Sequence, residues 1–255
     1  MCISHRAPLF VVPNKFDFVG PVSINSESEF LIPDRHDIDS WSGKALSEYS
    51  QFLRFLSVYP WNSTSETIYI FQYRKFVSRK QPPKVAKNAQ YAHLIVPTVA
   101  ENYFPASNES LGSDSTKQQL TGPVLTTHSN LCVTYGKHHR PEDFAAFCAC
   151  LVNVPDFGAA RIRSFIECPY FIPAPVLGCY RVDFLLYLTK VLRTAWESYQ
   201  PYFRARTGYQ ERVGGFLLER LHSFLLIEKM MRNPELFVSG YHVVCTDGDV
   251  LFPSG

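Results

Sequence analysis

Three clusters of polar side chains in this sequence could bind a phosphorylated ligand. The first is the pair Asp37 and Asp39. Two carboxylates one residue apart can turn toward one divalent cation, Mg²⁺ or Mn²⁺, which would bridge them to phosphate oxygens. The same pair also suits a helix start, with Asp39 as the N-cap and Asp37 in solvent. The sequence favours this second interpretation and leaves a metal site open.

The second cluster is Gln72, Tyr73, Arg74 and Lys75, which follow the apolar run 68–71. Such a short, nearly continuous run predicts a strand that is buried on both faces. Ligands of open α/β sheets bind beyond the carboxyl ends of the strands. Cations at this position can neutralise a diphosphate, and a guanidinium can bind two of its oxygens. The alternative is a strand end that has simply become exposed.

The third cluster, Arg212, Gly215 and Glu219, lies in the segment 209–232, which its apolar spacing predicts to be one long helix. Spacings of three and four residues place the cluster on one helix face. An interior glycine costs about 0.8–1.0 kcal/mol relative to alanine. The adjacent pair Gly214 and Gly215 therefore predicts close approach by another backbone or by a ligand. Glu219 could pair with Arg212 or bind a sugar hydroxyl, or the charges could hold this helix to the sheet.

Several familiar catalytic motifs do not occur in the sequence. It has no Gly-rich phosphate loop, no Gly-x-Ser-x-Gly elbow and no zinc-binding helix spacing among its histidines. His139 and Asp143, in the stretch "YGKHHRPEDFAAF", are reserve candidates for acid–base chemistry or acceptor binding.

The rest of the sequence predicts the elements that would position these clusters. A first short strand is expected at the N-terminus, a helix from about Asp39 to the residue before Pro60, and further strands in "AHLIVPTV" and "ELFVSGYHVVC". Helices are expected from Pro141 and over 181–199. The mixed order predicts one α/β domain over 1–255 with additional C-terminal helices. The breaker-rich stretch 105–123 predicts a mobile loop or plain disorder.

Composition excludes some classes of function. The net charge of +2 and the lack of a basic stripe argue against a nucleic-acid partner. No run of 18 apolar residues predicts a membrane-spanning helix, and no signal peptide is recognisable. The seven scattered cysteines, an odd number, indicate reduced thiols. We therefore expect a cytoplasmic protein.

Five stretches in this order resemble a bacterial family known as "domain of unknown function 4422", which is regarded as a glycosyltransferase family. They are "CISHR", "DIDSWSGKALSEYSQFLRFLSVYPWN", "IYIFQYRKFVS", "YGKHHRPEDFAAF" and "YQERVGGFLLERLHSFLL". The resemblance covers nearly the whole chain, and the last stretch is its longest and most specific match. It implies a GT-A-like, Rossmann-like domain with a mostly parallel central sheet. It also implies transfer of a sugar from a nucleotide-sugar donor to a glycan or lipid-linked acceptor of capsule or lipopolysaccharide.

If the chain is such a transferase, the chemistry of glycosyl transfer suggests roles for residues of all three clusters. Arg74 and Arg212 would neutralise the diphosphate and Glu219 would be the base, although the positive charges of its neighbours Arg212 and Arg220 would weaken it in that role. Further donor-binding candidates are His5, Arg6, Asp37, Asp39, Gln72, Tyr73, Lys75, Gly215 and Arg220. The enzyme would work at the inner membrane surface or with other glycosyltransferases.

Two departures from the family pattern keep a second reading open. Gln72 stands where the family usually has a histidine, and Pro175 and Val176 stand where it usually has Asn-Met. Glutamine can form hydrogen bonds but cannot titrate near neutral pH. The alternative is therefore a degenerate, non-catalytic relative that binds sugar or a partner glycosyltransferase.

Overall fold

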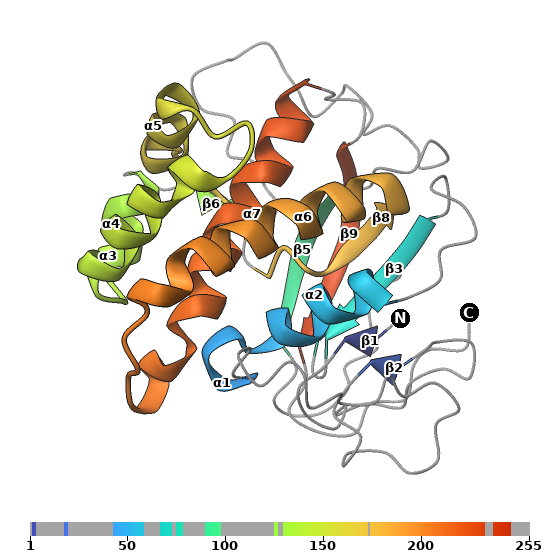
Figure 1. Cartoon of the computed structure of the whole chain (residues 1–255). Helices are drawn as coiled ribbons and strands as arrows, with labels where there is room; N and C mark the ends of the chain where they lie inside the picture. Colours follow the sequence, from blue (N-terminus) through green and yellow to red (C-terminus); the bar gives the residue numbers. More distant parts are fainter. Residues whose placement is uncertain are drawn as a thin grey trace.

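The structure is a computed structural model in which helices pack against a sheet. It describes residues 2–3, 18–19, 43–58, 67–72, 75–78, 90–97, 125–126, 130–172, 174–232 and 237–245. Figure 1 shows helices α2 (Glu48–Val58) and α6 (Val182–Tyr199) lying across one face of the sheet. Helices α3 (Leu131–Gly136), α4 (Pro141–Cys150) and α5 (Ala159–Glu167) gather at the side of the sheet where β6 (Leu125–Thr126) lies.

The main sheet has seven strands in the order β2-β1-β3-β4-β9-β5, and β8 also pairs with β3. The strands are β1 (Cys2–Ile3), β2 (Phe18–Val19), β3 (Thr67–Gln72), β4 (Lys75–Ser78), β5 (Gln90–Pro97), β8 (Gly178–Arg181) and β9 (Phe237–Cys245). Strand β1 runs parallel to β2 and to β3, whereas the β3–β4, β3–β8, β4–β9 and β5–β9 pairs are antiparallel.

This pairing differs from the mostly parallel sheet that the sequence led us to expect. Gln72 at the end of β3 pairs with Lys75 at the start of β4. A parallel neighbour needs a crossover of a dozen or more residues, so a connection this short requires an antiparallel pair. The expected first strand, the strand at 68–71 and the last strand are confirmed, and the strand expected over 92–99 is found at Gln90–Pro97. The GT-A-like fold remains a prediction.

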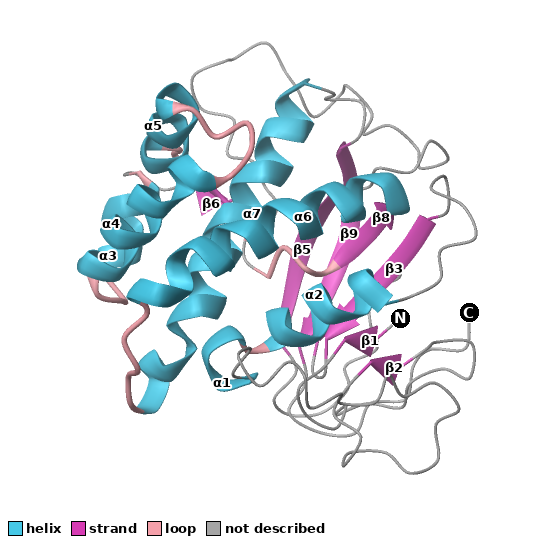
Figure 2. Cartoon of the chain, viewed as in Figure 1, coloured by secondary structure: helices cyan, strands magenta, loops and turns pink. Residues whose placement is uncertain are grey.

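The remaining helices are α1 (Gly43–Leu46), α3 (Leu131–Gly136), α4 (Pro141–Cys150), α5 (Ala159–Glu167) and α7 (Val213–Arg232). Strand β6 and β7 (Tyr170–Phe171) form a separate antiparallel pair, and Figure 2 distinguishes these helices and strands by colour. The predicted helices at Pro141 and at 181–199 are confirmed as α4 and α6. The long C-terminal helix begins at Val213, because residues 208–212 form a 3₁₀ turn.

The helix that we expected from Asp39 is interrupted at Ser47. This residue has a φ of 53°, in the left-handed region, and it separates α1 from α2. A helical turn cannot continue through a positive φ, so the chain changes direction there. Asp39 itself and the stretch 105–123 lie outside the described residues.

The two glycines at the start of α7 allow α1 and α6 to pack closely against it. A Cβ on Gly214 would lie 2.6 Å from Cζ3 of Trp196, and a Cβ on Gly215 would lie 2.9 Å from the backbone oxygen of Leu46. The close approach that the sequence predicted is therefore confirmed, and at both positions it involves protein atoms. Trp196 is itself almost completely buried, so this contact lies in the core.

Candidate functional site

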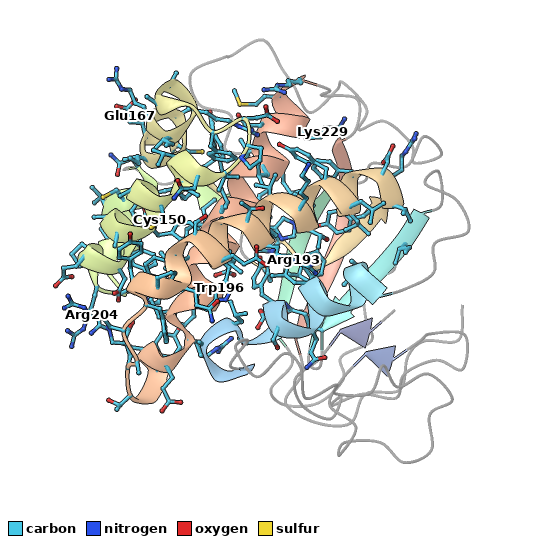
Figure 3. All side chains as sticks on the ribbon, viewed as in Figure 1. Cys150, Glu167, Arg193, Trp196, Arg204 and Lys229 are labelled. Atoms are coloured by element: carbon cyan, nitrogen blue, oxygen red, sulfur yellow. The ribbon has the colours of Figure 1, made fainter. Side chains whose placement is uncertain are left out.

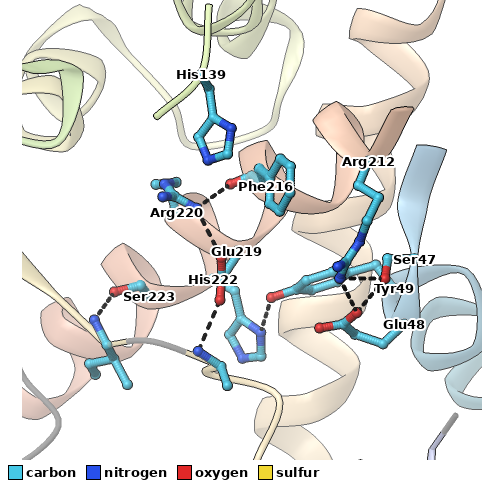
Figure 4. Close-up of polar contacts among 12 residues, drawn as sticks. Ser47, Glu48, Tyr49, His139, Arg212, Phe216, Glu219, Arg220, His222 and Ser223 are labelled. Carbon is cyan, nitrogen blue, oxygen red and sulfur yellow. Dashed lines mark hydrogen bonds and ion pairs between the residues drawn. The ribbon is translucent and has the colours of Figure 1, made fainter. Parts of the chain in front are cut away.

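Three segments far apart in the sequence meet at the carboxylate of Glu48. Glu48 is the first residue of α2, Gln72 is the last residue of β3, and Arg212 directly precedes α7. Nε2 of Gln72 donates a hydrogen bond to Oε1 of Glu48 at 3.0 Å. Nη2 of Arg212 pairs with Oε2 of the same carboxylate at 3.3 Å, as Figure 4 shows. Glu48 thus joins the end of a buried strand to the start of the longest helix.

The backbone turn at Ser47 places this carboxylate. The Ser47 hydroxyl donates to Oε2 of Glu48 at 2.5 Å and accepts from Nη2 of Arg212 at 2.8 Å. The Ser50 hydroxyl in turn donates to the Ser47 backbone oxygen at 2.8 Å. The interruption between α1 and α2 therefore directs two consecutive polar side chains toward Arg212.

The guanidinium of Arg212 is held on one side and open on the other. Its side chain is 41% exposed, whereas that of Glu48 is 19% exposed. Its guanidinium carbon lies 5.4 Å from the centre of the Phe216 ring, and its buried Nε has no hydrogen-bond partner among the described residues. The exposed side of this guanidinium could therefore bind an anionic group, with Glu48 offsetting part of the charge.

The structure does not pair Glu219 with Arg212. Oε1 of Glu219 accepts from the backbone nitrogen of Ala174 at 2.9 Å, and Oε2 accepts from Nη1 of Arg220 at 2.9 Å. Both oxygens are thus engaged by protein donors (Figure 4). Arg212 also precedes α7, so it does not share a face of that helix with Gly215 and Glu219. We infer that Glu219 holds backbone in place.

Arg220 is buried and fully surrounded by protein groups. Its Nη1 also donates to the backbone oxygen of Phe216 at 3.2 Å. Its guanidinium carbon lies 4.7 Å from the centre of the Phe171 ring and 5.4 Å from that of Tyr135. These contacts favour a packing role over the donor-binding role expected from the sequence.

Two side chains of α7 hold the segment that carries Pro175 and Val176. The Ser223 hydroxyl accepts from the backbone nitrogen of Ile172 at 2.7 Å, as Glu219 does from that of Ala174. Val176 is completely buried, and the Pro175 backbone oxygen accepts from the Tyr180 hydroxyl. The residues that replace Asn-Met of the family pattern are therefore part of the core.

His139 is a packed, neutral side chain. Its ring stacks on Phe216 with 4.1 Å between ring centres and on Tyr209 with 5.9 Å. Burial, with a smaller effect from the charge of Arg220, lowers the pKa of His139 to about 4, although a hydrogen bond to Gln210 opposes the shift. A group with such a pKa is a weak base near neutral pH.

Asp143, the other reserve candidate, is buried and paired. Its Oδ1 accepts from Nη2 of Arg206 at 2.8 Å. The pair lies near the first turn of α4 and takes no part in the contacts around Glu48.

Several expected site residues lie outside the described part of the chain. These are His5, Arg6, Asp37, Asp39, Tyr73 and Arg74, together with the side chain of Lys75. The meeting of Arg74 with Arg212 and the metal pair Asp37–Asp39 therefore stay predictions. Within the described ranges, no group of three or more His, Cys, Asp or Glu side chains could hold a metal ion. Within the same ranges, no helix is both long enough and apolar enough to cross a membrane.

Sequence reasoning did not identify Ser47 and Glu48. In a continuous helix over the predicted range, both would be ordinary surface positions. Only the left-handed φ of Ser47 turns them toward Arg212. No local pattern in the sequence marks that break.

Known proteins provide no independent guide to this site. Comparisons with family models, with curated proteins and with solved structures found no match for the chain. The resemblance to a glycosyltransferase family is therefore a prediction that rests on the sequence motifs.

Proposed function

We propose that this chain is a glycosyltransferase that moves a sugar from a nucleotide-sugar donor to a growing bacterial surface polysaccharide. The observation that carries the proposal is the partly exposed guanidinium of Arg212, fixed by Glu48 at the carboxyl end of β3. Strand β1 runs parallel to β3, so the carboxyl ends of these two strands lie side by side. In open α/β sheets, ligands bind at such an edge.

The chemistry of glycosyl transfer explains why a fixed cation is useful there. Breaking the bond to the anomeric carbon develops positive charge on the sugar ring and negative charge on the leaving diphosphate. A preorganised guanidinium stabilises that negative charge without reorganising during the reaction. Arg212 meets this requirement because Ser47 and Glu48 hold one side of its guanidinium.

Other parts of the donor site are proposed from the sequence alone. Arg74 would be the second cation on the diphosphate, Tyr73 would stack on the base or sugar, and Asp37 and Asp39 would bind Mg²⁺ or Mn²⁺ if a metal takes part. The proposal places no base at Glu219, because both of its carboxylate oxygens accept hydrogen bonds from the protein.

The second candidate is a non-catalytic relative that binds sugar or a partner glycosyltransferase. The amide of Gln72 is buried and bound to Glu48, so this position offers no group that titrates near neutral pH. If the histidine of the family takes part in proton transfer, this chain has lost that step.

A nucleotide-sugar screen tests the proposal. We expect at least one uridine, guanosine or thymidine diphosphate sugar, with or without Mn²⁺, to raise the melting temperature and to be hydrolysed or transferred. Arg212→Ala should abolish both effects, whereas the exposed Arg163→Ala should retain them. A melting-temperature rise without turnover would favour the non-catalytic candidate. No response to any donor, or a fully active Arg212→Ala protein, would refute the diphosphate site.

A further inference from the structure

A pocket of about 430 Å³ lies beside the first turns of α4, away from Glu48. Its lining includes Glu142, Asp143, Pro201, Tyr202, Arg204 and Arg206. Figure 3 shows Arg204 at this edge of the molecule. The volume is near the lower end of the range for small-molecule sites, about 300–1,000 Å³. It is therefore suited to a ligand of one or two rings.

The polar lining of this pocket is balanced in charge. The ion pair between Asp143 and Arg206, at 2.8 Å, is mostly buried, with side chains 7% and 18% exposed. Glu142 and Arg204 add one exposed charge of each sign. Two acids and two arginines leave no net charge, so the pocket offers both donors and acceptors without selecting for a cation or an anion.

An exposed aromatic side chain completes the lining. Tyr202 is 64% exposed, and it follows the exposed Pro201 in the 3₁₀ turn after α6. A large apolar face that remains in solvent beside a polar pocket is available to a ligand with an apolar surface. The lining therefore combines a flat aromatic face with charged hydrogen-bonding groups whose charges cancel.

We propose that this pocket binds an uncharged sugar ring, one unit of a glycan acceptor. The C–H face of a sugar can pack on Tyr202, and its hydroxyls can accept hydrogen bonds from the arginines and donate hydrogen bonds to the carboxylates. An anionic or cationic ligand would leave two of the four charged side chains unmatched or repelled. Calling the glycan an acceptor rests on the proposed function, whereas the sugar pocket itself does not.

A chain of contacts connects the pocket to Arg212. Asp143 lies in the first turn of α4, four residues after His139, and His139 stacks on Phe216 with 4.1 Å between ring centres. The Arg212 guanidinium lies over the same Phe216 ring. The sugar pocket and the proposed diphosphate site are therefore linked through one aromatic cluster but are not adjacent. The pocket would hold a unit of the glycan away from the reacting hydroxyl, which must come within about 3.5 Å of the anomeric carbon.

Saturation-transfer NMR on the full chain tests the pocket without using any donor. The probes are neutral methyl glycosides of glucose, galactose, mannose and rhamnose and their disaccharides at millimolar concentration, with glucuronic acid and glucosamine as charged probes. We expect at least one neutral probe to bind, and we expect Tyr202→Ala to weaken the affinity for that probe about tenfold. Arg204→Ala should weaken it as well. Met231→Ala, which alters an equally exposed apolar side chain outside the pocket, should not.

Three results would refute the proposal that this pocket binds a sugar. They are no binding of any neutral probe, binding that Tyr202→Ala leaves unchanged, and preference for a charged probe. Near-UV circular dichroism checks that the variant is folded. The donor screen is a separate measurement. Sugar binding without a response to any nucleotide-sugar donor would refute the proposed transferase function and support the sugar pocket. A donor response without sugar binding would refute only the sugar pocket.

Discussion

Glu48 and Arg212 lie 164 positions apart in the sequence and form an ion pair, with 3.3 Å between Oε2 and Nη2. The other carboxylate oxygen of Glu48 binds Gln72. The pair thus fixes the orientation of a partly exposed cation relative to the end of β3.

Glu48→Gln should reduce activity more than stability. The variant keeps the shape of the side chain but loses the charge that positions Arg212, and a small displacement of a transition-state cation can lower kcat/KM by about tenfold or more. Because Arg212 is 41% exposed, the loss of unfolding free energy should be below about 1 kcal/mol. Donor turnover and urea unfolding measure the two effects.

The matched control for this variant is Glu228→Gln. Glu228 pairs with Arg161 on α5, and these two side chains are 19% and 18% exposed. Glu228→Gln should lower the unfolding free energy at least as much as Glu48→Gln does, and it should leave donor turnover unchanged. Equal turnover for Glu48→Gln and the wild-type protein would show that Glu48 does not position Arg212 for the reaction.

Glu219→Gln should leave most activity in place. Its amide oxygen can still accept from the Ala174 nitrogen, so we expect a loss of about 1–2 kcal/mol in unfolding free energy from the weaker contact with Arg220. Glu219→Ala removes both acceptors and should cost more. A stable Glu219→Gln protein without turnover would instead make Glu219 the base, against the hydrogen bonding found in the structure.

Gly214→Ala and Gly215→Ala should each destabilise the protein. The added Cβ atoms would lie 2.6 Å from a Trp196 carbon and 2.9 Å from the Leu46 backbone oxygen. Overpacking of this kind costs about 1–3 kcal/mol, which exceeds the gain of about 1 kcal/mol in helix propensity. In Gly136→Ala the new Cβ would lie 3.7 Å from Pro141 Cβ, an ordinary contact, so this control should be neutral or stabilising. Equal thermal stability of all three would contradict the close packing of α1 and α6 on α7.

The unfolding free energy should fall as pH is lowered from 7 to 5. Burial lowers the pKa of His222 to about 3 and contributes most to a pKa of about 4 for His139. An unfolded histidine has a pKa near 6.5. Below that pH the unfolded chain binds protons that the folded chain does not, so stability is present above pH 6.5 and is lost toward acid. At pH 5 the loss from His222 alone should be about 2 kcal/mol relative to pH 7.

Urea unfolding of His222→Gln at both pH values isolates this contribution. The variant cannot titrate at position 222, so its loss between pH 7 and pH 5 should be about 2 kcal/mol smaller than that of the wild-type protein. His138→Gln, which replaces an exposed histidine, is the matched control for the substitution itself. Parallel pH profiles for the wild-type protein and His222→Gln would show that burial does not keep His222 neutral.

Local signals in the sequence were sufficient for the elements that depend on neighbouring residues. The apolar run 68–71 predicted β3, Pro141 predicted the start of α4, and helical spacing predicted α6 and most of α7. These signals work because strand burial, helix capping and helical periodicity involve residues a few positions apart.

The glycine pair marks the limit of such reasoning. Gly214 and Gly215 predicted that another group packs closely against the start of α7. They did not predict which group it is, and the structure shows α1 and Trp196 there. The antiparallel neighbours of β3 and the break at Ser47 were likewise not predicted. Strand order and helix breaks depend on which distant surfaces pack together, and no short pattern carries that information.

Residue types alone showed that the sequence contains arginines, carboxylates and amides of the kind that can bind a phosphorylated ligand. The tertiary structure decided which groups interact. Arg212 pairs with Glu48, whereas Glu219 pairs with Arg220 and accepts a hydrogen bond from the Ala174 backbone nitrogen. A charged side chain pairs with whichever opposite charge the packed backbone brings within a few ångströms, because the interaction decays with distance in space. Here the close packing of α1 on α7 brings Glu48 to Arg212 across most of the chain.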